Sequence, residues 1–349
     1  MMIYTLFFIS SGLFLGWSLG ANDAANLFGT AVGTRMIRFY TAAVIISIFV
    51  IIGAVVSGSG ASHTLGALGD VNTLAGAFIV ALAAALTVFW MTRFGLPVST
   101  SQAIVGAIIG WNFFAGLETD KAVLTKIVST WITGPILSAV FAVIFYLIIK
   151  AGLERLKIHL FRIDSYNRLA LIVVGAFGAY SLGANNIANV MGVFTGVSPF
   201  EPVSVFGLFQ LSPVQQLFLL GGISIAVGVF TYSKRVMMTV GRGIFKISPL
   251  AALIVVLSSS TVLFLFASQA LKTWLTVRGL PSFPLVPVSS SQAVVGAVIG
   301  IGLIKGGRDI NLSVLRNIAL GWVVTPLISA LISYISLFFM QNVFMQPVY

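Results

Sequence analysis

A single aspartate lies where an ionisable side chain is costly, in the middle of an apolar segment. The sequence has eight acidic residues, and only Asp23 falls deep inside a segment long and apolar enough to cross a membrane. A carboxylate in such a place usually marks the path of an ion or a substrate; the alternative is an aspartate that only caps a buried helix end. Asn22 and Asn26 lie beside it, and their amides can serve a cation through oxygen or an anion through nitrogen. These three residues are therefore candidate ligands.

The motif that contains Asp23 occurs twice. Ser18–Asn26, with the sequence SLGANDAAN, returns as Ser181–Asn189, SLGANNIAN, and seven of nine positions are identical. The second copy has the same amides but no carboxylate. The counterparts of Asn22, Asp23 and Asn26 are Asn185, Asn186 and Asn189.

Two further segments present hydroxyl groups at the start of an apolar helix. Pro97–Gly110, PVSTSQAIVGAIIG, returns as Pro287–Gly300, PVSSSQAVVGAVIG, with eleven of fourteen positions identical. Proline suits the start of a helix and serine or threonine caps it, so backbone N–H groups and the helix dipole point at whatever lies in front. With several hydroxyl donors this is a strong site for a tetrahedral oxyanion, although small residues can also serve only close helix packing. The candidate ligands are Ser99, Thr100, Ser101, Gln102, Ser289, Ser290, Ser291 and Gln292.

A third repeated motif indicates that the whole chain is an internal duplication. Trp131–Pro135, WITGP, is echoed by Trp322–Pro326, WVVTP, so three pairs of motifs follow one another in the same order. The offset between the copies grows from 163 to 190 and 191, which places about 27 extra residues in the second half. We expect these residues in loops such as Ser198–Pro213 and Arg278–Val286.

The elements that position these motifs must be membrane helices. The chain of 349 residues is 58% hydrophobic and 8% charged, with a mean hydropathy of +1.08. A soluble protein carries far more charge, and apolar runs of about 20 residues, enough to cross a ~30 Å bilayer core, recur along the chain. Because there is no cysteine, disulfides, iron–sulfur clusters and thiolate metal sites are excluded. Cytoplasmic loops explain the net charge of +11 better than nucleic acid as a partner does.

We expect ten membrane crossings, five in each half. With the N-terminus outside, fifteen of the nineteen basic residues fall in inner loops, as the positive-inside rule requires. Equivalent loops carry opposite charge signatures, and an odd number of crossings per copy turns the second copy upside down. The protein is thus predicted in the cell (inner) membrane as a multi-pass protein with both termini outside. The predicted spans are residues 3–34, 39–57, 73–92, 97–117, 122–149, 169–197, 214–232, 248–271, 285–304 and 313–344.

The predicted fold is an all-α polytopic membrane protein with two inverted-topology repeats, broken helices and re-entrant-like half-helices at the midplane. Residues 1–150 form the first repeat, 151–168 a cytoplasmic linker and 169–349 the second repeat. The segment around Asp23 is too long for one straight crossing, so we expect one half-helix to end near Gly20 and another to begin near Asn22. We expect the same break in the second copy. Such repeats are typical of secondary transporters, which bind their cargo where the halves meet.

No lysine or arginine falls in the predicted bilayer core near these motifs. An anion bound beside Asp23 would therefore be repelled unless cations were bound with it. If the cargo is an anion, this arrangement favours cation-coupled symport.

With these motifs the chain resembles the inorganic phosphate transporter (PiT) family. A Gly-Ala-Asn-Asp-like motif and a Pro-Val/Ile-Ser-Thr-Thr/Ser-like motif in each half are typical of that family. The resemblance implies phosphate uptake driven by sodium or protons and an inverted repeat, and it allows a homodimer. Asn186 replaces the second aspartate, and Val50 stands where some relatives carry a glutamate; with fewer titratable groups, sodium is favoured over protons. The matching segments are Gly20–Asn26, Gly183–Asn189, Pro97–Gln102 and Pro287–Gln292.

We therefore predict a sodium/phosphate symporter that works by alternating access and is not an enzyme. Its expected partners are inorganic phosphate, sodium and the lipid bilayer, and no cofactor is expected besides sodium as the coupling ion. Proton coupling, sulfate as the substrate and an ion channel are the alternatives, and which group serves which ion stays open. The predicted phosphate ligands are Asn22, Asp23, Thr100, Ser101, Gln102, Asn185, Ser290, Ser291 and Gln292. The predicted sodium ligands are Asp23, Asn26, Ser99, Asn186, Asn189 and Ser289.

Overall fold

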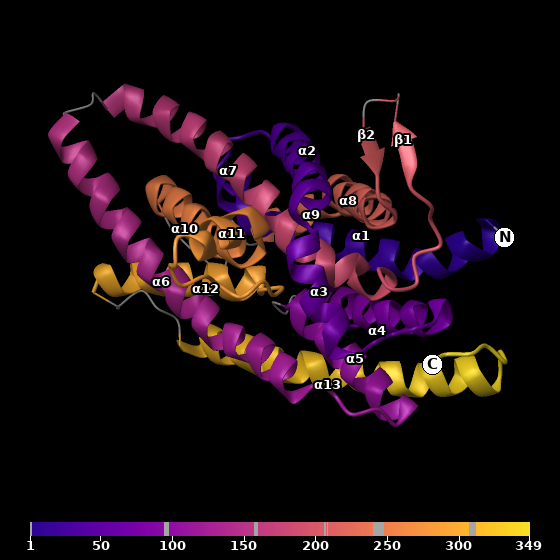
Figure 1. Cartoon of the computed structure of the whole chain (residues 1–349). Coiled ribbons are helices and arrows are strands. Elements are labelled where there is room, and N and C mark those ends of the chain that lie inside the picture. The colour runs from indigo at the N-terminus through magenta and orange to yellow at the C-terminus, as the bar shows by residue number, and fades with distance from the viewer. Residues whose placement is uncertain are drawn as a thin grey trace.

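The computed structural model describes residues 2–93, 98–156, 160–205, 207, 209–239, 248–306 and 312–349. Within these ranges the chain is almost entirely helical (Figure 1). The first half contains α1 (Met2–Gly33), α2 (Phe39–Ser57), α3 (Ser59–Leu68), α4 (Leu74–Arg93), α5 (Thr100–Ala115) and α6 (Lys121–Leu156). The second half contains α7 (Leu160–Met191), the 3-10 turn η1 (Gly192–Phe194), β1 (Val203–Val205), β2 (Phe209–Leu211), α8 (Pro213–Thr231), α9 (Ser233–Thr239), α10 (Pro249–Ala267), α11 (Gln269–Val277), α12 (Ser290–Ile304) and α13 (Leu312–Asn342). The two strands form an antiparallel hairpin in which Val203 is opposite Leu211.

Eight of the described helices are long and apolar enough to cross a membrane: α1, α2, α4, α6, α7, α8, α10 and α13. Together with α5 and α12 they follow the ten predicted spans in order, so the chain is a multi-span membrane protein. α5 and α12 have 16 and 15 residues, or about 24 and 22 Å at 1.5 Å per residue. Both are shorter than a ~30 Å bilayer core, as expected of half-helices.

The predicted breaks in α1 and α7 are wrong. Both helices run through their Asn motifs without interruption. A Cβ at Gly20 would overlap the backbone carbonyl of Ile225 in α8, so this glycine serves close helix contact rather than unwinding. Asn22 does not cap a second half-helix, because its side-chain amide donates to the carboxylate of Asp23. Local hydrogen bonds and small residues thus let an intact helix carry the polar motif.

The two halves contact each other reciprocally. Gly20 of α1 lies against Ile225 of α8, and its counterpart Gly183 of α7 lies against Val50 of α2. Each motif helix therefore packs on the second helix of the other half, as in two copies related by an approximate twofold axis. Other exchanged contacts join Gly53 with Tyr180, Gly228 with Trp17, Gly106 with Pro326, and Gly296 with Pro135.

The extra residues of the second half form two local structures. The segment Ser198–Pro213 contains the β hairpin. A second insertion lies between α10 and α12, which are separated by 22 residues, whereas α4 and α5 are separated by 6. This insertion contains α11 as well as the predicted loop Arg278–Val286. Of the predicted linker 151–168, residues up to Leu156 continue α6 and residues from Leu160 onward belong to α7.

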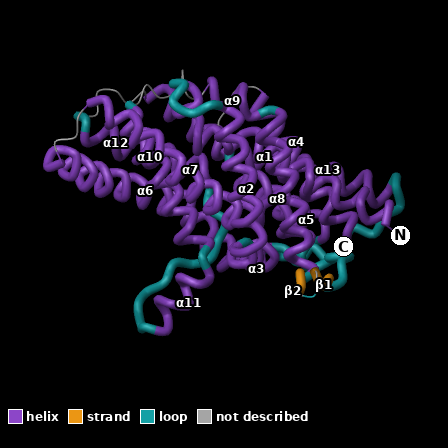
Figure 2. Tube along the Cα trace, turned by 90° about the horizontal axis from the view of Figure 1, so that it is seen from above, coloured by secondary structure: helices purple, strands orange, loops and turns teal. Residues whose placement is uncertain are grey.

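Loops predicted to be outside and inside lie on opposite sides of the molecule. In Figure 2, α3, α11 and the β hairpin lie on the lower side and α9 lies on the upper side. The two termini lie at the same end of the protein (Figure 1). There the hydroxyl of Tyr4 donates to the side-chain oxygen of Gln346 at 3.0 Å.

Candidate functional site

The four repeated motifs meet in the interior of the protein. Hydrogen bonds join α1 to α12, and they join α7 to both α5 and the segment between α11 and α12. All predicted site residues are buried except Asn22 and Asn26, which are half-buried. We call this set the central polar cluster: Asn22, Asp23, Asn26, Ser99, Thr100, Ser101, Gln102, Asn185, Asn186, Asn189, Ser289, Ser290, Ser291 and Gln292.

Asp23 supplies the charge of the cluster. It is 2% exposed and is the only charged side chain among the buried residues in the described part of the chain. The hydroxyl of Ser290 donates to its Oδ2 at 2.6 Å, and the amide of Asn22 donates to its Oδ1 at 2.9 Å. A carboxylate has about four lone-pair sites, so it can accept further donors or bind a cation. Oxygen ligands of this kind suit hard cations rather than soft ones.

The motif on α7 holds the backbone in front of α12. The amide of Asn185 donates to the carbonyl oxygen of Val288 at 2.7 Å, and its own oxygen accepts the N–H of Val288 at 3.2 Å. The hydroxyl of Ser101 donates to the same carbonyl at 3.3 Å and accepts from Asn189 at 2.8 Å. Because both polar groups of Val288 are bound, the N-terminus of α12 is held in one position.

Both short helices begin inside the protein at a serine cap. Ser99 accepts the backbone N–H of Gln102 at 3.2 Å, and Ser289 accepts that of Gln292 at 3.3 Å. Ser289 and Ser291 also share a hydrogen bond of 3.1 Å. The remaining N–H groups of a first helical turn have no partner within the helix and point toward the space in front of it. They are donors for an oxyanion. Pro97, which begins the first of these motifs, lies outside the described residues.

Several buried polar atoms of the cluster have no hydrogen-bond partner. An unpaired buried donor or acceptor costs about 1–3 kcal/mol, and native proteins keep few of them. A group of them in one place therefore indicates a ligand site. An amide offers both an acceptor for a cation and a donor for an oxyanion, and a hydroxyl does the same. The unpaired atoms are Oγ1 of Thr100, Oε1 of Gln102 and Gln292, Nδ2 of Asn26 and Asn186, and Oδ1 of Asn189.

Equivalent residues of the two copies make different contacts. Asp23 accepts a hydrogen bond from Ser290. Their counterparts are Asn186 and Thr100, whose Nδ2 and Oγ1 atoms have no partner. A site that is nearly symmetric in sequence is therefore asymmetric in its hydrogen bonds.

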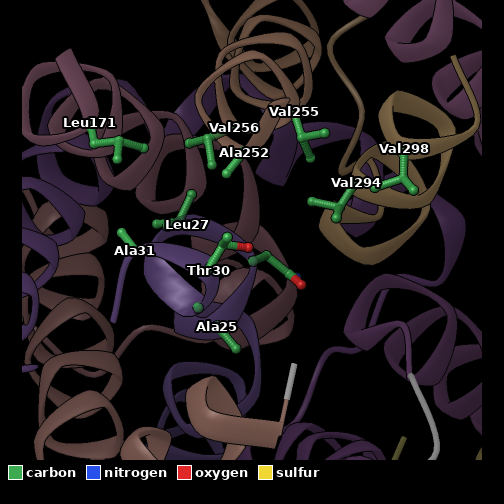
Figure 3. A pocket seen from close by; sticks show the side chains of 12 residues that line it. Ala25, Leu27, Thr30, Ala31, Leu171, Ala252, Val255, Val256, Val294 and Val298 are labelled. Atoms are coloured by element: carbon green, nitrogen blue, oxygen red, sulfur yellow. The ribbon is translucent and has the colours of Figure 1, made fainter. Parts of the chain in front are cut away.

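A small cavity continues from the cluster along one face of α1. Asn22, Asn26 and Thr30 are spaced by four residues, so they share a helix face, and all three are half-buried. Asn26 and Thr30 line a cavity of about 20 Å³, which has room for about one water. Figure 3 shows Thr30 and Leu27 of α1 at this cavity with Val255 of α10 and Val294 of α12. The equivalent positions of the second copy are buried: Asn185 and Asn189 on α7 and Val193 in the following turn η1.

The sequence motifs did not indicate two features of this site. Asn185 was predicted to bind phosphate, whereas in the structure both the nitrogen and the oxygen of its side-chain amide are hydrogen-bonded to the backbone of Val288. A contact to the backbone does not depend on the residue type of the partner, so the sequence gives no sign of it. Thr30 was not considered, although its spacing of four residues from Asn26 could have indicated a shared face.

Comparisons with known proteins agree with this architecture. The sequence model of the phosphate transporter family matches residues 19–167 and again residues 158–333. The chain is 29% identical to a Pyrococcus abyssi protein assigned by name as a phosphate permease, with 93% of this chain and 95% of the relative covered. A relative with the same assignment from Methanocaldococcus jannaschii is also 29% identical, with 92% and 93% covered.

A solved structure described as a sodium-dependent phosphate transporter has the same fold. Its TM-score is 0.74, and the match covers 97% of this chain and 100% of that one at 23% identity. The family match confirms the resemblance to phosphate transporters that the sequence motifs indicated, and with it the prediction that the chain is a transporter and not an enzyme. The chain belongs to the phosphate transporter family.

Proposed function

We propose that this protein imports inorganic phosphate together with sodium ions by alternating access, and that the central polar cluster binds both. The observation that carries the proposal is one buried carboxylate, Asp23, hydrogen-bonded to the N-terminus of the half-length helix α12. The segment before α12 is in turn hydrogen-bonded to the N-terminus of the other half-length helix, α5. The helix N-termini attract an oxyanion, and the carboxylate attracts a cation. No buried lysine or arginine in the described chain offsets a bound anion, so cations have to enter with it.

Phosphate binds between the N-termini of α5 and α12. Thr100 and Ser291 offer hydroxyl donors to it, and the backbone N–H groups of the first turns of both helices add further donors. The hydroxyls of Ser101 and Ser290 donate to Val288 and Asp23, so these two residues contribute through their backbone N–H groups, and the side-chain N–H groups of Gln102 and Gln292 complete the shell. The unpaired hydroxyl of Thr100 supports this assignment, because it is free to donate to an oxyanion. Asn22 acts through Asp23, and Asn185 acts through Val288, so both position the site.

Sodium binds at Asp23 and at the amide oxygens of Asn26, Asn186 and Asn189. The hydroxyls of Ser99 and Ser289 already cap helices, which makes them secondary ligands. Sodium is favoured over protons because Asn186 replaces a carboxylate, which leaves Asp23 as the one buried acid of the described chain. The description of the solved neighbour as sodium-dependent supports the same ion here.

We propose that alternating access arises when α1 and α7 exchange their environments, one beside a cavity and the other buried. The face of α1 at Asn26 and Thr30 borders a cavity, whereas the equivalent face of α7 is buried. In the opposite state the two halves exchange these environments, as inverted repeats do in other transporters. The cavity lies toward the C-terminal end of α1, which the charge distribution assigns to the cytoplasm.

The orientation in the membrane can be tested directly because the chain has no cysteine. The inverted repeats and both external termini are proposals that rest on loop charge and on the reciprocal helix contacts. A single cysteine at His63 is expected to react with an impermeant maleimide from outside, and one at Lys305 only after the membrane is opened. The reverse pattern would contradict the topology. The homodimer is a further prediction, which light scattering of the purified protein can check.

Labelled phosphate uptake into proteoliposomes tests the proposed function. Sodium and proton gradients are imposed separately, with equal membrane potential. We expect saturable accumulation of phosphate against its gradient only when sodium is higher outside. Uptake that follows the proton gradient and ignores sodium would overturn sodium coupling, and downhill flux without accumulation would favour a channel.

Sulfate is the second candidate substrate because it is also a tetrahedral oxyanion. An excess of unlabelled sulfate is expected to leave phosphate uptake unchanged. Full competition at equal concentrations would make the protein a general oxyanion permease.

A further inference from the structure

A second polar cavity lies on the side predicted to face the outside. α3, α6, α11 and the segment before α12 enclose about 230 Å³, far above the ~10–15 Å³ that holds one water. It therefore admits a hydrated polyatomic anion. We call it the outer vestibule, and its polar lining is His63, Thr64, Lys126, Gln269 and Lys272.

The outer vestibule has positive charge that the protein does not neutralise. Lys126 comes from α6 and Lys272 from α11. Neither lysine forms an ion pair with any residue in the described ranges, and His63 beside them adds an imidazole. Two ammonium groups that face one cavity raise the local concentration of anions.

The outer vestibule and the central polar cluster share one segment of chain. Leu285 lines the vestibule, and its carbonyl oxygen accepts the hydroxyl of Thr64 at 2.5 Å. Five residues later, Ser290 donates to Asp23. Five residues span at most about 18 Å, so the wall of the vestibule at Leu285 lies within about 18 Å of Ser290 along this segment.

The basic lining belongs to one face only. The offset of 191 between Trp131 and Trp322 aligns Lys126 with Asn317 in the other copy. Lys272 lies on α11, in the insertion between α10 and α12 that the first half lacks. The duplication therefore does not explain the vestibule, which is an addition to one side of the protein.

We infer that the outer vestibule is a capture site for inorganic phosphate, where Lys126 and Lys272 hold the oxyanion before it passes to the central polar cluster. This inference rests on the proposed function. Capture raises the rate at which dilute external phosphate reaches the central polar cluster. It does not change the rate at which the protein, once loaded with phosphate, completes the transport cycle. Loss of the two lysines is thus expected to change the apparent KM for external phosphate and to leave the maximal rate unchanged.

The test compares Lys126→Gln, Lys272→Gln and the double variant with a double control, Lys121→Gln with Arg278→Gln. The control removes the same net charge from the same face, at two residues that do not line the vestibule. Phosphate uptake is measured in uniformly oriented proteoliposomes at fixed sodium, with ionic strength varied by choline chloride. We expect KM to rise about threefold for each lysine and about tenfold for the double variant, within the range of electrostatic steering. The rise in KM that added salt causes in the unmodified protein is expected to disappear in the double variant.

Two results would overturn the inference. One is a double variant whose KM and salt dependence equal those of the double control. The other is a loss of maximal rate with unchanged KM, which indicates a structural role. Phosphate uptake by the unmodified protein separates this failure from failure of the proposed function, because the latter abolishes uptake before any lysine is changed.

Discussion

Replacement of Asp23 by asparagine tests how sodium and phosphate are coupled. The change keeps the size of the side chain and removes its charge. In the structure the Asp23 carboxylate accepts from Ser290 at 2.6 Å, and phosphate is proposed to bind at the same helix N-terminus. The Ser290 oxygen can still accept a hydrogen bond from dihydrogen phosphate, and a second hydrogen bond of ~2.7 Å of this kind places the anion about 5 Å from the carboxylate oxygen.

The expected magnitude follows from this distance. At about 5 Å and an effective dielectric constant of ~20, two unit charges repel by about 3 kcal/mol, or roughly 100-fold in a binding constant. Sodium at Asp23 removes this repulsion, so it is expected to raise the affinity of the unmodified protein for phosphate roughly 100-fold. In Asp23→Asn, phosphate is expected to bind without sodium about as well as with it, and coupled transport is expected to stop.

Equilibrium binding of labelled phosphate to the purified protein measures this coupling. Sodium is varied from zero to saturation, and choline chloride keeps the ionic strength constant. Asp70→Asn is the matched control, because Asp70 is exposed between α3 and α4. Equal thermal unfolding midpoints show that both variants are folded. If Asp23→Asn keeps the full sodium dependence of phosphate affinity, Asp23 does not couple the two ions.

Three further substitutions, one of them paired with a control variant, test the site and the helix packing around it. Ser290→Ala removes a hydrogen bond to a buried charge, worth about 1.5–3 kcal/mol, so the free energy of unfolding of the sodium-free protein is expected to fall by about that amount; an unchanged unfolding midpoint would contradict this contact. Gly183→Ala brings a Cβ against the carbonyl of Val50 and is expected to destabilise the protein by about 1–3 kcal/mol. Gly66→Ala meets open space in α3 and is expected to leave the unfolding midpoint unchanged or raised; equal effects would contradict the packing argument. Thr30→Val removes the hydroxyl from the cavity beside α1, and it is expected to slow transport roughly fivefold while equilibrium phosphate binding persists.

Duplication made much of the site predictable. One copy of the Asp23 motif could be a packing element, but two copies in a fixed order with two hydroxyl motifs indicate residues that meet. The caps at Ser99 and Ser289 were predicted for the same reason, since Pro followed by a run of hydroxyls suits few other local structures.

The role of Gly20 and the position of the outer vestibule depend on tertiary contacts, which the sequence alone did not predict. Gly20 was interpreted as a helix break, and in the structure it allows α1 to touch the carbonyl of Ile225. A glycine has the same local signature in both cases, so only the packing partner separates them. Lys126 and Lys272 are 146 positions apart in sequence, and their common cavity depends on where the chain places α11 relative to α6. Charge counts assigned both to one side of the membrane and gave no indication that they share a cavity.

A crystal structure with arsenate and sodium would show where the transported anion binds. Arsenate is a tetrahedral oxyanion like phosphate, and anomalous scattering locates its arsenic atom without reference to the protein. We expect a strong arsenic peak between the N-termini of α5 and α12, in contact with Thr100 and Ser290 and close to Asp23. Arsenate that binds only away from these helix ends would contradict the proposed phosphate site.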